Sequence, residues 1–252
     1  MTFTDYLNEV LDRLSEKGTF GLEDIKETII KADYSKVGEL GEISAFSNNS
    51  TTVLYSGMMD SGVKTQNYVL TMQDIRIIDH SVVGNMLSND QFKKYVNKAI
   101  QNDIMAGKFD VDLVRKGFRD PNGAEYLEFV DELKNVTPAT INDVAKKAAN
   151  AFDYEPTQGA WAIASKEFVK NTPPDSNIIC VVPNADTSRT WGQVEVITAL
   201  DELPDTQKIE GTTVGELKKL VHDGEIDINK KYGDVWNELK NEAQVYDDIL
   251  TR

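Results

Sequence analysis

Cysteine and histidine are scarce in this chain of 252 residues, which has one cysteine, Cys180, and two histidines, His80 and His222. A single cysteine cannot form an intramolecular disulfide, and two histidines exclude a histidine-rich metal site. The sequence also lacks CxxC and HExxH motifs and EF-hand loops, so we expect no metal. Cys180 lies in the apolar run "SNIICVVP", which favours a buried small hydrophobic residue over the alternative, a catalytic thiol.

Basic residues are in deficit, 27 against 42 acidic ones, so the net charge is −15 and the pI is about 4.6. Such a surface repels nucleic-acid phosphates and anionic lipids. No apolar run approaches the roughly 20 residues of a membrane span. The N-terminal "MTFTDYLNEVLDRLSEKG" carries acids where a signal peptide has basic and apolar regions. We therefore expect no nucleic-acid or membrane partner, and a protein that is cytoplasmic or is secreted without a classical signal peptide.

The hydrophobic pattern changes along the chain from helical spacing to a mixture of short strands and helices. Helical periodicity predicts helices near residues 3–17, 22–32, 88–105, 122–134, 138–151 and 159–170. Short strands are expected in "TTVLYSG" and at 177–182, 192–200 and 207–211, with further helices in "TVGELKKLVHDG" and "GDVWNELKNEAQVYDDIL". This pattern predicts an α/β (α+β) fold with a mainly helical lobe, 1–155, and a smaller lobe, 156–252. In the smaller lobe we expect a short parallel sheet flanked by helices, with a ligand cleft between the lobes.

Four stretches each place an aromatic or acidic residue beside small residues at the end of a predicted element. They are "VLYSGMMD" (53–60), "RIIDHSVVGNML" (76–87), "GAWAIASKEF" (159–168) and "TWGQVEVITAL" (190–200). In order and spacing they resemble the motifs of the ADP-ribosyl cyclase and NAD glycohydrolase family of animals, over about residues 50–200. The matching positions are Tyr55-Ser56 for a Trp-Ser pair, Asp79 and Gly84 for an acid and a glycine, Trp161 and Ser165 for a Trp followed by Ser, and Trp191-Gly192-Gln193-Val194-Glu195 for Phe-Gly-x-x-Glu. The first two motifs fall in the expected first lobe and the last two in the second.

The resemblance implies an enzyme that cleaves the nicotinamide–ribose bond of NAD+, with NAD as substrate and no separate cofactor. It implies that Glu195 is the catalytic carboxylate and that Asp79 influences whether water or the adenine traps the ribosyl intermediate. Trp161 and Tyr55 would form flat walls that orient the substrate rings. The residues implied to hold ribose or pyrophosphate are Ser56, Ser165, Thr190, Trp191 and Gly192.

Elementary chemistry supports a lone glutamate in this role. Cleaving the bond leaves a ribosyl cation that resembles the oxocarbenium ion of glycoside hydrolysis. A carboxylate such as Glu195 can stabilise that charge, and does so more strongly where water is excluded. The leaving group is a cationic pyridinium that departs neutral, so no strong general acid is needed.

Three positions depart from the family pattern. Tyr55 stands where the family has Trp, Asp79 where it has Glu, and Gly57 where a basic residue often follows the Trp-Ser pair. The shorter acid leaves open whether the product is ADP-ribose or cyclic ADP-ribose. The animal enzymes are extracellular and rich in disulfides, which this chain cannot form internally. A bacterial or phage-type relative that acts on cytosolic NAD, such as an NAD-depleting toxin or effector, fits better.

Each candidate residue also has a purely structural interpretation. Glu195 and Gln193 share one parity and would form the wet face of a strand whose valines face the core. Trp161 lies on a predicted helix and could pack in the core as readily as line a cleft. Trp191 stands beside a glycine at the start of a predicted strand, and this arrangement favours another group packed against the indole. The other structural interpretations are core or rim for Tyr55, a turn cap for Asp79 and packing for Ser165.

Other functions stay open at this stage. The same residues could form a non-catalytic module that binds NAD or ADP-ribose as a signal. A structural or immunity protein with a chance resemblance would keep Trp161, Tyr55 and Glu195 far apart, and glycosidase chemistry would pair Asp79 with Glu195. For an NAD-depleting toxin, a neutralising or delivery protein is the expected partner, and it could dock on the region from about Asp201.

Overall fold

The computed structural model describes residues 2–34, 36–39, 42–45, 51–57, 64–182 and 188–223. Its contacts divide the chain into two units, residues 1–45 with 78–167 and residues 46–77 with 168–252. The expected boundary between 155 and 156 lies inside the first unit. In the described ranges, no helix has the length and apolar character needed to cross a membrane.

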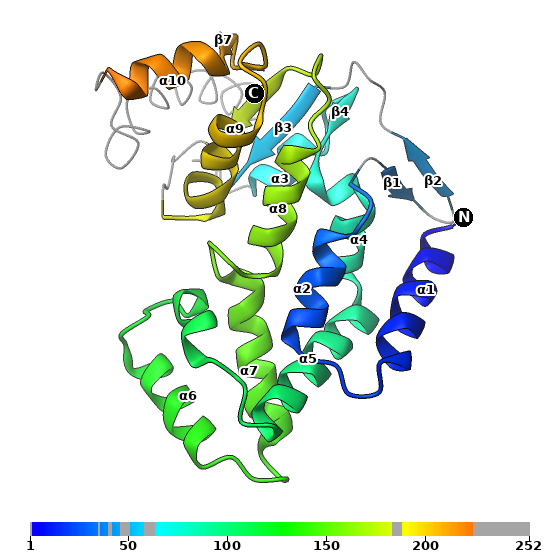
Figure 1. The fold of residues 1–252 in the computed structure, drawn as a ribbon, viewed down its shortest axis with the longest axis vertical. Helices are drawn as coiled ribbons and strands as arrows, with labels where there is room; N and C mark the ends of the chain where they lie inside the picture. The colour runs from blue at the N-terminus through cyan, green and yellow to red at the C-terminus, as the bar shows by residue number, and fades with distance from the viewer. Residues whose placement is uncertain are drawn as a thin grey trace. The chain divides into compact units, whose positions relative to one another are not determined.

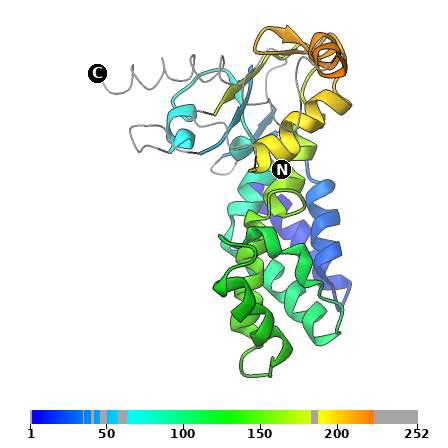
Figure 2. The ribbon, with the colours of Figure 1, turned by 90° about the vertical axis from the view of Figure 1, so that its left-hand side faces the viewer.

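The first unit is mainly helical, as its sequence periodicity predicts. Its helices are α1 (Phe3–Glu16), α2 (Leu22–Ile30), α4 (Val82–Ser88), α5 (Asp90–Met105), α6 (Ala124–Lys134), α7 (Ile141–Tyr154) and most of α8 (Ala160–Lys170). Short 3₁₀ turns lie at Ile78–His80 (η1), Val111–Leu113 (η2) and Arg115–Gly117 (η3), and β1 (Lys36–Glu39) pairs antiparallel with β2 (Glu42–Ala45). Helix α5 is central, since it packs on α1, α2, α4 and α7 (Figures 1 and 2).

Helix α1 shows how local sequence produces these elements. Thr2 and Asp5 form a reciprocal capping box at its start, which satisfies two of the free N–H groups of the first turn. Four apolar residues at helical spacing, from Leu7 to Leu14, are buried. The chain leaves the helix at Gly18, whose φ of +71° is in the left-handed region that favours glycine.

The second unit contains a five-stranded sheet with helices. Its strands are β3 (Thr51–Tyr55), β4 (Ile75–Arg76), β5 (Ile178–Val181), β6 (Lys208–Ile209) and β7 (Thr212–Thr213), in the order β4-β3-β5-β6-β7. The first four are mutually parallel and β7 is antiparallel to β6. The helical elements are α3 (Thr65–Val69), a π-helical segment η4 (Trp191–Glu195), α9 (Val196–Glu202) and α10 (Val214–His222). The mixed α/β fold is confirmed, as is the parallel pairing of the short strands.

The expected strand at 192–200 is wrong, because this stretch is helical. Only Gln193 and Ile197 are exposed between residues 191 and 200, and they are four residues apart, as expected for one face of a helix. The polar–apolar alternation from Gln193 to Val196 covers only four residues, too short to distinguish a strand from a helix. The helix expected in "GDVWNELKNEAQVYDDIL" lies outside the described residues.

A buried arginine fixes the short strand β4 within the second unit. The Arg76 guanidinium lies 3.8 Å from the centroid of the Phe168 ring and donates a hydrogen bond of 3.0 Å to the Phe168 carbonyl. Burial lowers the pKa of Arg76 to about 9, so the group is still charged at neutral pH. The stacked ring and the carbonyl offset part of the cost of burying this charge.

Candidate functional site

The parallel strands of the second unit have a topological switch point between β3 and β5. From β3 the chain crosses to β4 on one side, and from β5 it crosses to β6 on the other. In open α/β sheets, ligands bind outside the carboxyl ends of the strands at this kind of position. Here those ends are Tyr55 and Val181, which are paired in register, and the Ser56 N–H donates to the Val181 carbonyl at 3.2 Å.

Glu195 is buried close to this edge of the sheet. Its side chain is 6% exposed, and Trp191, four residues earlier in the same π-helical segment, is 1% exposed. The segment packs against β3 and continues directly into α9. In a strand, Glu195 would share the wet face with Gln193; in the observed helix, Gln193 is exposed and Glu195 faces inward. The structural interpretation of Glu195 as an outward-facing strand residue is therefore wrong.

Cys180 on β5 is the residue that Trp191 and Glu195 approach. The Trp191 side chain lies close to the Cys180 thiol and acts to lower its pKa. Burial raises the pKa of the Cys180 thiol well above its ordinary value, and the nearby carboxylates of Glu210 and Glu195 raise it further. A thiol held neutral in this way is a poor nucleophile, so the buried interpretation of Cys180 is confirmed over a catalytic one.

Glu210 brings a second carboxylate to the same place, and the sequence analysis did not identify it. It lies in the turn between β6 and β7, and its Oε1 accepts a hydrogen bond of 2.5 Å from the backbone N–H of Cys180. The signal in the sequence is "KIEGTT", where a charged residue precedes a turn glycine between two short strands.

Trp191 and Tyr55 do not both line one open slot. The Trp191 indole is enclosed, so it supports the segment from within and does not present a face for stacking. Tyr55 packs with Val53, Val69 and Val181, the cluster on the α3 face of the sheet. Because alternate strand residues point to opposite faces, Tyr55 lies on the other face from Cys180 and the Trp191 indole. The expected role of Tyr55 as a wall beside Glu195 is not supported by this position.

The remaining candidates of the second unit, which the resemblance implies for ribose or pyrophosphate, lie at the end of β3 and at the start of the helix that carries Glu195. Ser56 is half-buried at the end of β3, and Gly57 after it has a φ of +79°, a backbone conformation that favours glycine over the basic residue of the family. Thr190 and Gly192 lie in the first turn of the helix that continues as α9, and the Gln193 N–H already donates to the Arg189 carbonyl. The start of a helix is favourable for a phosphate group.

Asp79 and Gly84 belong to the first unit. Asp79 is half-buried in the 3₁₀ turn η1, and its carbonyl accepts a hydrogen bond of 3.2 Å from the Asn85 side chain. A Cβ atom at Gly84 would lie 2.1 Å from the Ile78 carbonyl oxygen, so only glycine allows α4 to pack this closely against η1. The cap of α4 is the Ser81 hydroxyl, which accepts from the Gly84 N–H at 3.1 Å.

Trp161 and Ser165 lie one turn apart on α8 of the first unit. Trp161 is half-buried and Ser165 is 4% exposed. The start of α8 is held by Glu155, a buried carboxylate that the sequence analysis missed. Its oxygens accept hydrogen bonds from the backbone N–H groups of Thr157, Gln158 and Gly159 and from the Thr157 hydroxyl. The signal was an acid just before the turn residues "PTQG".

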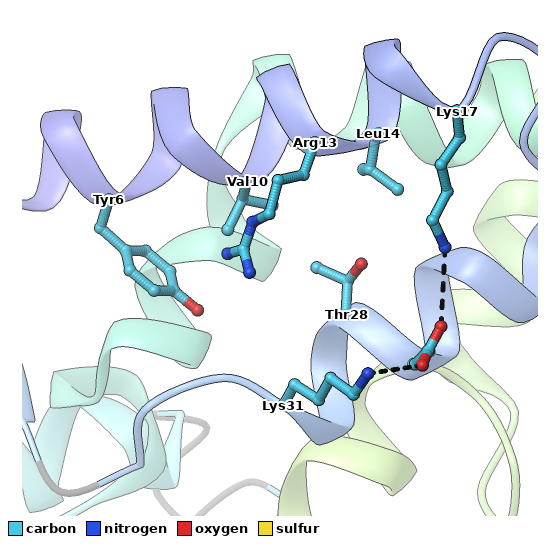
Figure 3. A pocket seen from close by; sticks show the side chains of 8 residues that line it. Tyr6, Val10, Arg13, Leu14, Lys17, Thr28 and Lys31 are labelled. Carbon is cyan, nitrogen blue, oxygen red and sulfur yellow. Dashed lines mark hydrogen bonds and ion pairs between the residues drawn. The ribbon is translucent and has the colours of Figure 1, made fainter.

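A hollow between α1 and α2 is lined by three bases, Arg13, Lys17 and Lys31 (Figure 3). Each base already has a carboxylate within 4.0 Å. Lys31 and Lys17 approach Glu27 at 2.6 and 3.6 Å, Lys17 also binds Asp24 at 2.5 Å, and Arg13 lies 4.0 Å from Glu9. The hollow is charge-balanced, so it offers no excess positive charge for an anionic ligand.

Comparison with models of protein families, with curated proteins and with solved structures finds no match to this chain. The fold and the site define the class: an α/β protein with a glutamate buried near the carboxyl edge of the parallel strands of a small mixed sheet, beside the switch point.

Proposed function

We propose that this protein cleaves the nicotinamide–ribose bond of NAD+, and that Glu195 is the residue that stabilises the ribosyl cation. The observation that carries the proposal is the burial of the Glu195 carboxyl group, 6% exposed, near the sheet edge where α/β proteins bind ligands. In a chain with 42 acidic residues, most carboxylates have no reason to be buried. A carboxylate kept in a poorly solvated place is suited to stabilise a developing positive charge.

The proposed reaction needs few residues of the protein. When the pyridinium leaves as neutral nicotinamide, the C1′ carbon of the ribose becomes cationic, and the ionised Glu195 compensates that charge. Water then attacks C1′, loses a proton and gives ADP-ribose; attack by the adenine ring would give the cyclic product. The pyrophosphate would lie at the start of the helix that carries Glu195, held by Thr190 and the backbone at Gly192, with Ser56 at the ribose.

Trp161, Asp79 and Ser165 belong to the first unit, and their roles in the reaction stay predictions from the family resemblance. Trp161 is half-buried on α8, so part of its indole is accessible for stacking against a ring. Asp79 is half-buried in the 3₁₀ turn η1. Ser165 is buried one turn after Trp161, and we assign it to holding α8 rather than to direct contact.

The proposed setting is cytosolic NAD, where an NAD-depleting toxin or effector would act. Such a protein needs a partner that neutralises it in the cell that makes it, or one that delivers it. We place that contact on the chain after Asp201. The acidic surface, with a net charge of −15, favours a partner with a basic face.

The test is the incubation of the purified full chain with NAD+, followed by chromatography of the products. Release of nicotinamide together with ADP-ribose supports a glycohydrolase, and cyclic ADP-ribose supports a cyclase. Saturable binding of NAD+ without any release of nicotinamide would replace the enzyme with a non-catalytic binding module. Absence of both binding and release would end the proposal.

A further inference from the structure

The backbone conformation of the turn that joins β6 to β7 is unfavourable for one of its two residues. The pairing of Ile209 with Thr212 leaves a two-residue turn, Glu210-Gly211, with φ values of +50° and +82°. Both residues with positive φ make this a type I′ turn, whose first position prefers Asn, Asp or Gly. A glutamate in the left-handed region costs about 1–2 kcal/mol relative to the ordinary conformation, so other interactions of Glu210 must compensate.

The compensating contacts join this turn to β5. The Glu210 backbone N–H donates to the Ile178 carbonyl at 2.8 Å, and its Oε1 accepts from the Cys180 N–H at 2.5 Å. The strand β6 ends at Ile209, so the Glu210 side chain supplies the acceptor that the next residue of a longer strand would supply. Asn or Asp at this position would suit the turn, but each is one methylene shorter than glutamate.

Cys180 connects this anchor to the candidate catalytic residue. Its backbone is held by Glu210, its strand β5 pairs with β3, and β3 packs against the segment Trp191–Glu195. All four residues are part of the second unit, and Cys180, Trp191 and Glu195 are each less than 10% exposed. A shift of β5 at Cys180 would therefore be transmitted to the segment Trp191–Glu195 through packed side chains.

We propose that Glu210 is a positioning residue for Glu195, acting through its hydrogen bond to the Cys180 N–H and the packing of the paired strands β5 and β3 with the segment Trp191–Glu195. This inference rests on the proposed function, since Glu195 is the residue that Glu210 positions. Glu210 contributes an acceptor at a fixed place, and its negative charge is not required. A glutamine retains that acceptor; an asparagine keeps the turn and loses the reach.

The experiment measures nicotinamide release and the Trp191 indole N–H resonance in Glu210→Asn, Glu210→Ala and Glu210→Gln. The sequence has three tryptophans, so the resonance is assigned with Trp191→Phe. A small misplacement of a catalytic group costs up to about 10²-fold in turnover. We expect kcat to fall about 10- to 100-fold in the Asn and Ala variants with KM within about twofold, the indole resonance to shift, and Gln to restore both.

Asp74→Asn is the matched control. Asp74 is the other non-glycine residue with positive φ among the described residues, it is exposed in the same unit, and the change removes the same charge. Asparagine tolerates this backbone conformation, so neither turnover nor the Trp191 resonance should change. Thermal unfolding of each variant identifies any that fail to fold. If Glu210→Ala is unfolded, the test depends on Glu210→Asn, which keeps a residue that the turn favours.

Three outcomes would overturn the inference: unchanged kcat and indole resonance in folded Glu210→Asn, a change confined to KM, or failure of Gln to restore kcat. If the wild-type protein releases no nicotinamide, the proposed function fails by itself. The Trp191 resonance then still decides whether Glu210 holds the segment that carries Glu195. A shifted resonance in Glu210→Asn supports the structural link, and an unshifted one refutes it.

Discussion

Glu195 follows Trp191 by four residues in one π-helical segment, and both side chains are buried while Gln193 between them is exposed. The wider π-helical turn changes which residues face inward compared with a regular α-helix. Such turns are rare and occur frequently at functional sites. In this chain the result is a carboxylate directed to the inside of the second unit at the start of α9.

The first prediction concerns the charge of that carboxylate. Glu195→Gln keeps the size of the side chain and removes its negative charge, so the ribosyl cation loses its stabilising partner. We expect kcat for nicotinamide release from NAD+ to fall about 10²–10³-fold. The exposed Glu202, at the end of α9, provides the control: Glu202→Gln should retain wild-type turnover. Full activity of a folded Glu195→Gln protein would remove Glu195 from the mechanism.

The second prediction concerns Gly84 in the first unit. A Cβ atom there would lie 2.1 Å from the Ile78 carbonyl oxygen and 2.8 Å from the Asp79 Cα, and backbone atoms cannot move aside easily. We expect Gly84→Ala to lower the free energy of unfolding by about 3 kcal/mol, the upper range for overpacking. Urea titration measures this, with Ser88→Ala at the exposed end of α4 as a control that changes little. A loss below about 0.5 kcal/mol would contradict the tight packing of α4 on η1.

The third prediction tests how α8 is held. Glu155→Ala removes a buried carboxylate that accepts four hydrogen bonds at the start of the helix and leaves backbone N–H groups without their acceptor. We expect a loss of about 2–3 kcal/mol in the free energy of unfolding. Glu155→Gln retains an acceptor and should lose less. If the alanine and glutamine variants were both as stable as the wild type, the Glu155 hydrogen bonds would make no net contribution to the free energy of unfolding.

The sequence was sufficient for the helices of the first unit because their apolar spacing and caps are local. Leu7, Val10, Leu11 and Leu14 lie at the spacing of one helical face, and Gly18 ends the helix within the next turn. The burial of Cys180 could also be predicted, because its neighbours in the strand are apolar on both sides. The parallel sheet followed from short strands alternating with helices.

The part of the site that could not be predicted depends on contacts distant in sequence. The stretch Gln193–Val196 alternates like a strand, but it forms the end of a π-helical segment and the start of α9. Glu210 and Cys180 are 30 residues apart, and no local pattern indicates that a turn carboxylate accepts from a strand N–H. The placement of Tyr55 on the α3 face depends on the register of β3 with β5, which the sequence does not state.

The last prediction concerns pH and Asp153 on α7. Burial raises the pKa of this carboxyl group from 3.8 to about 6, against a smaller opposing effect of Lys93. The native protein then binds this proton more tightly than the unfolded chain does. The contribution of Asp153 to the free energy of unfolding therefore falls as the pH rises from about 4 to 6, and it stays at the lower value at higher pH.

Asp153→Asn removes the cost of ionising this buried group. We expect it to raise the free energy of unfolding by about 1–2 kcal/mol at pH 8, allowing for partial exposure, and by much less near pH 4. Urea titrations at both pH values measure this, with Asp143→Asn, exposed on the same helix, as the control. A gain in stability that did not depend on pH would show that the Asp153 charge is not its cause.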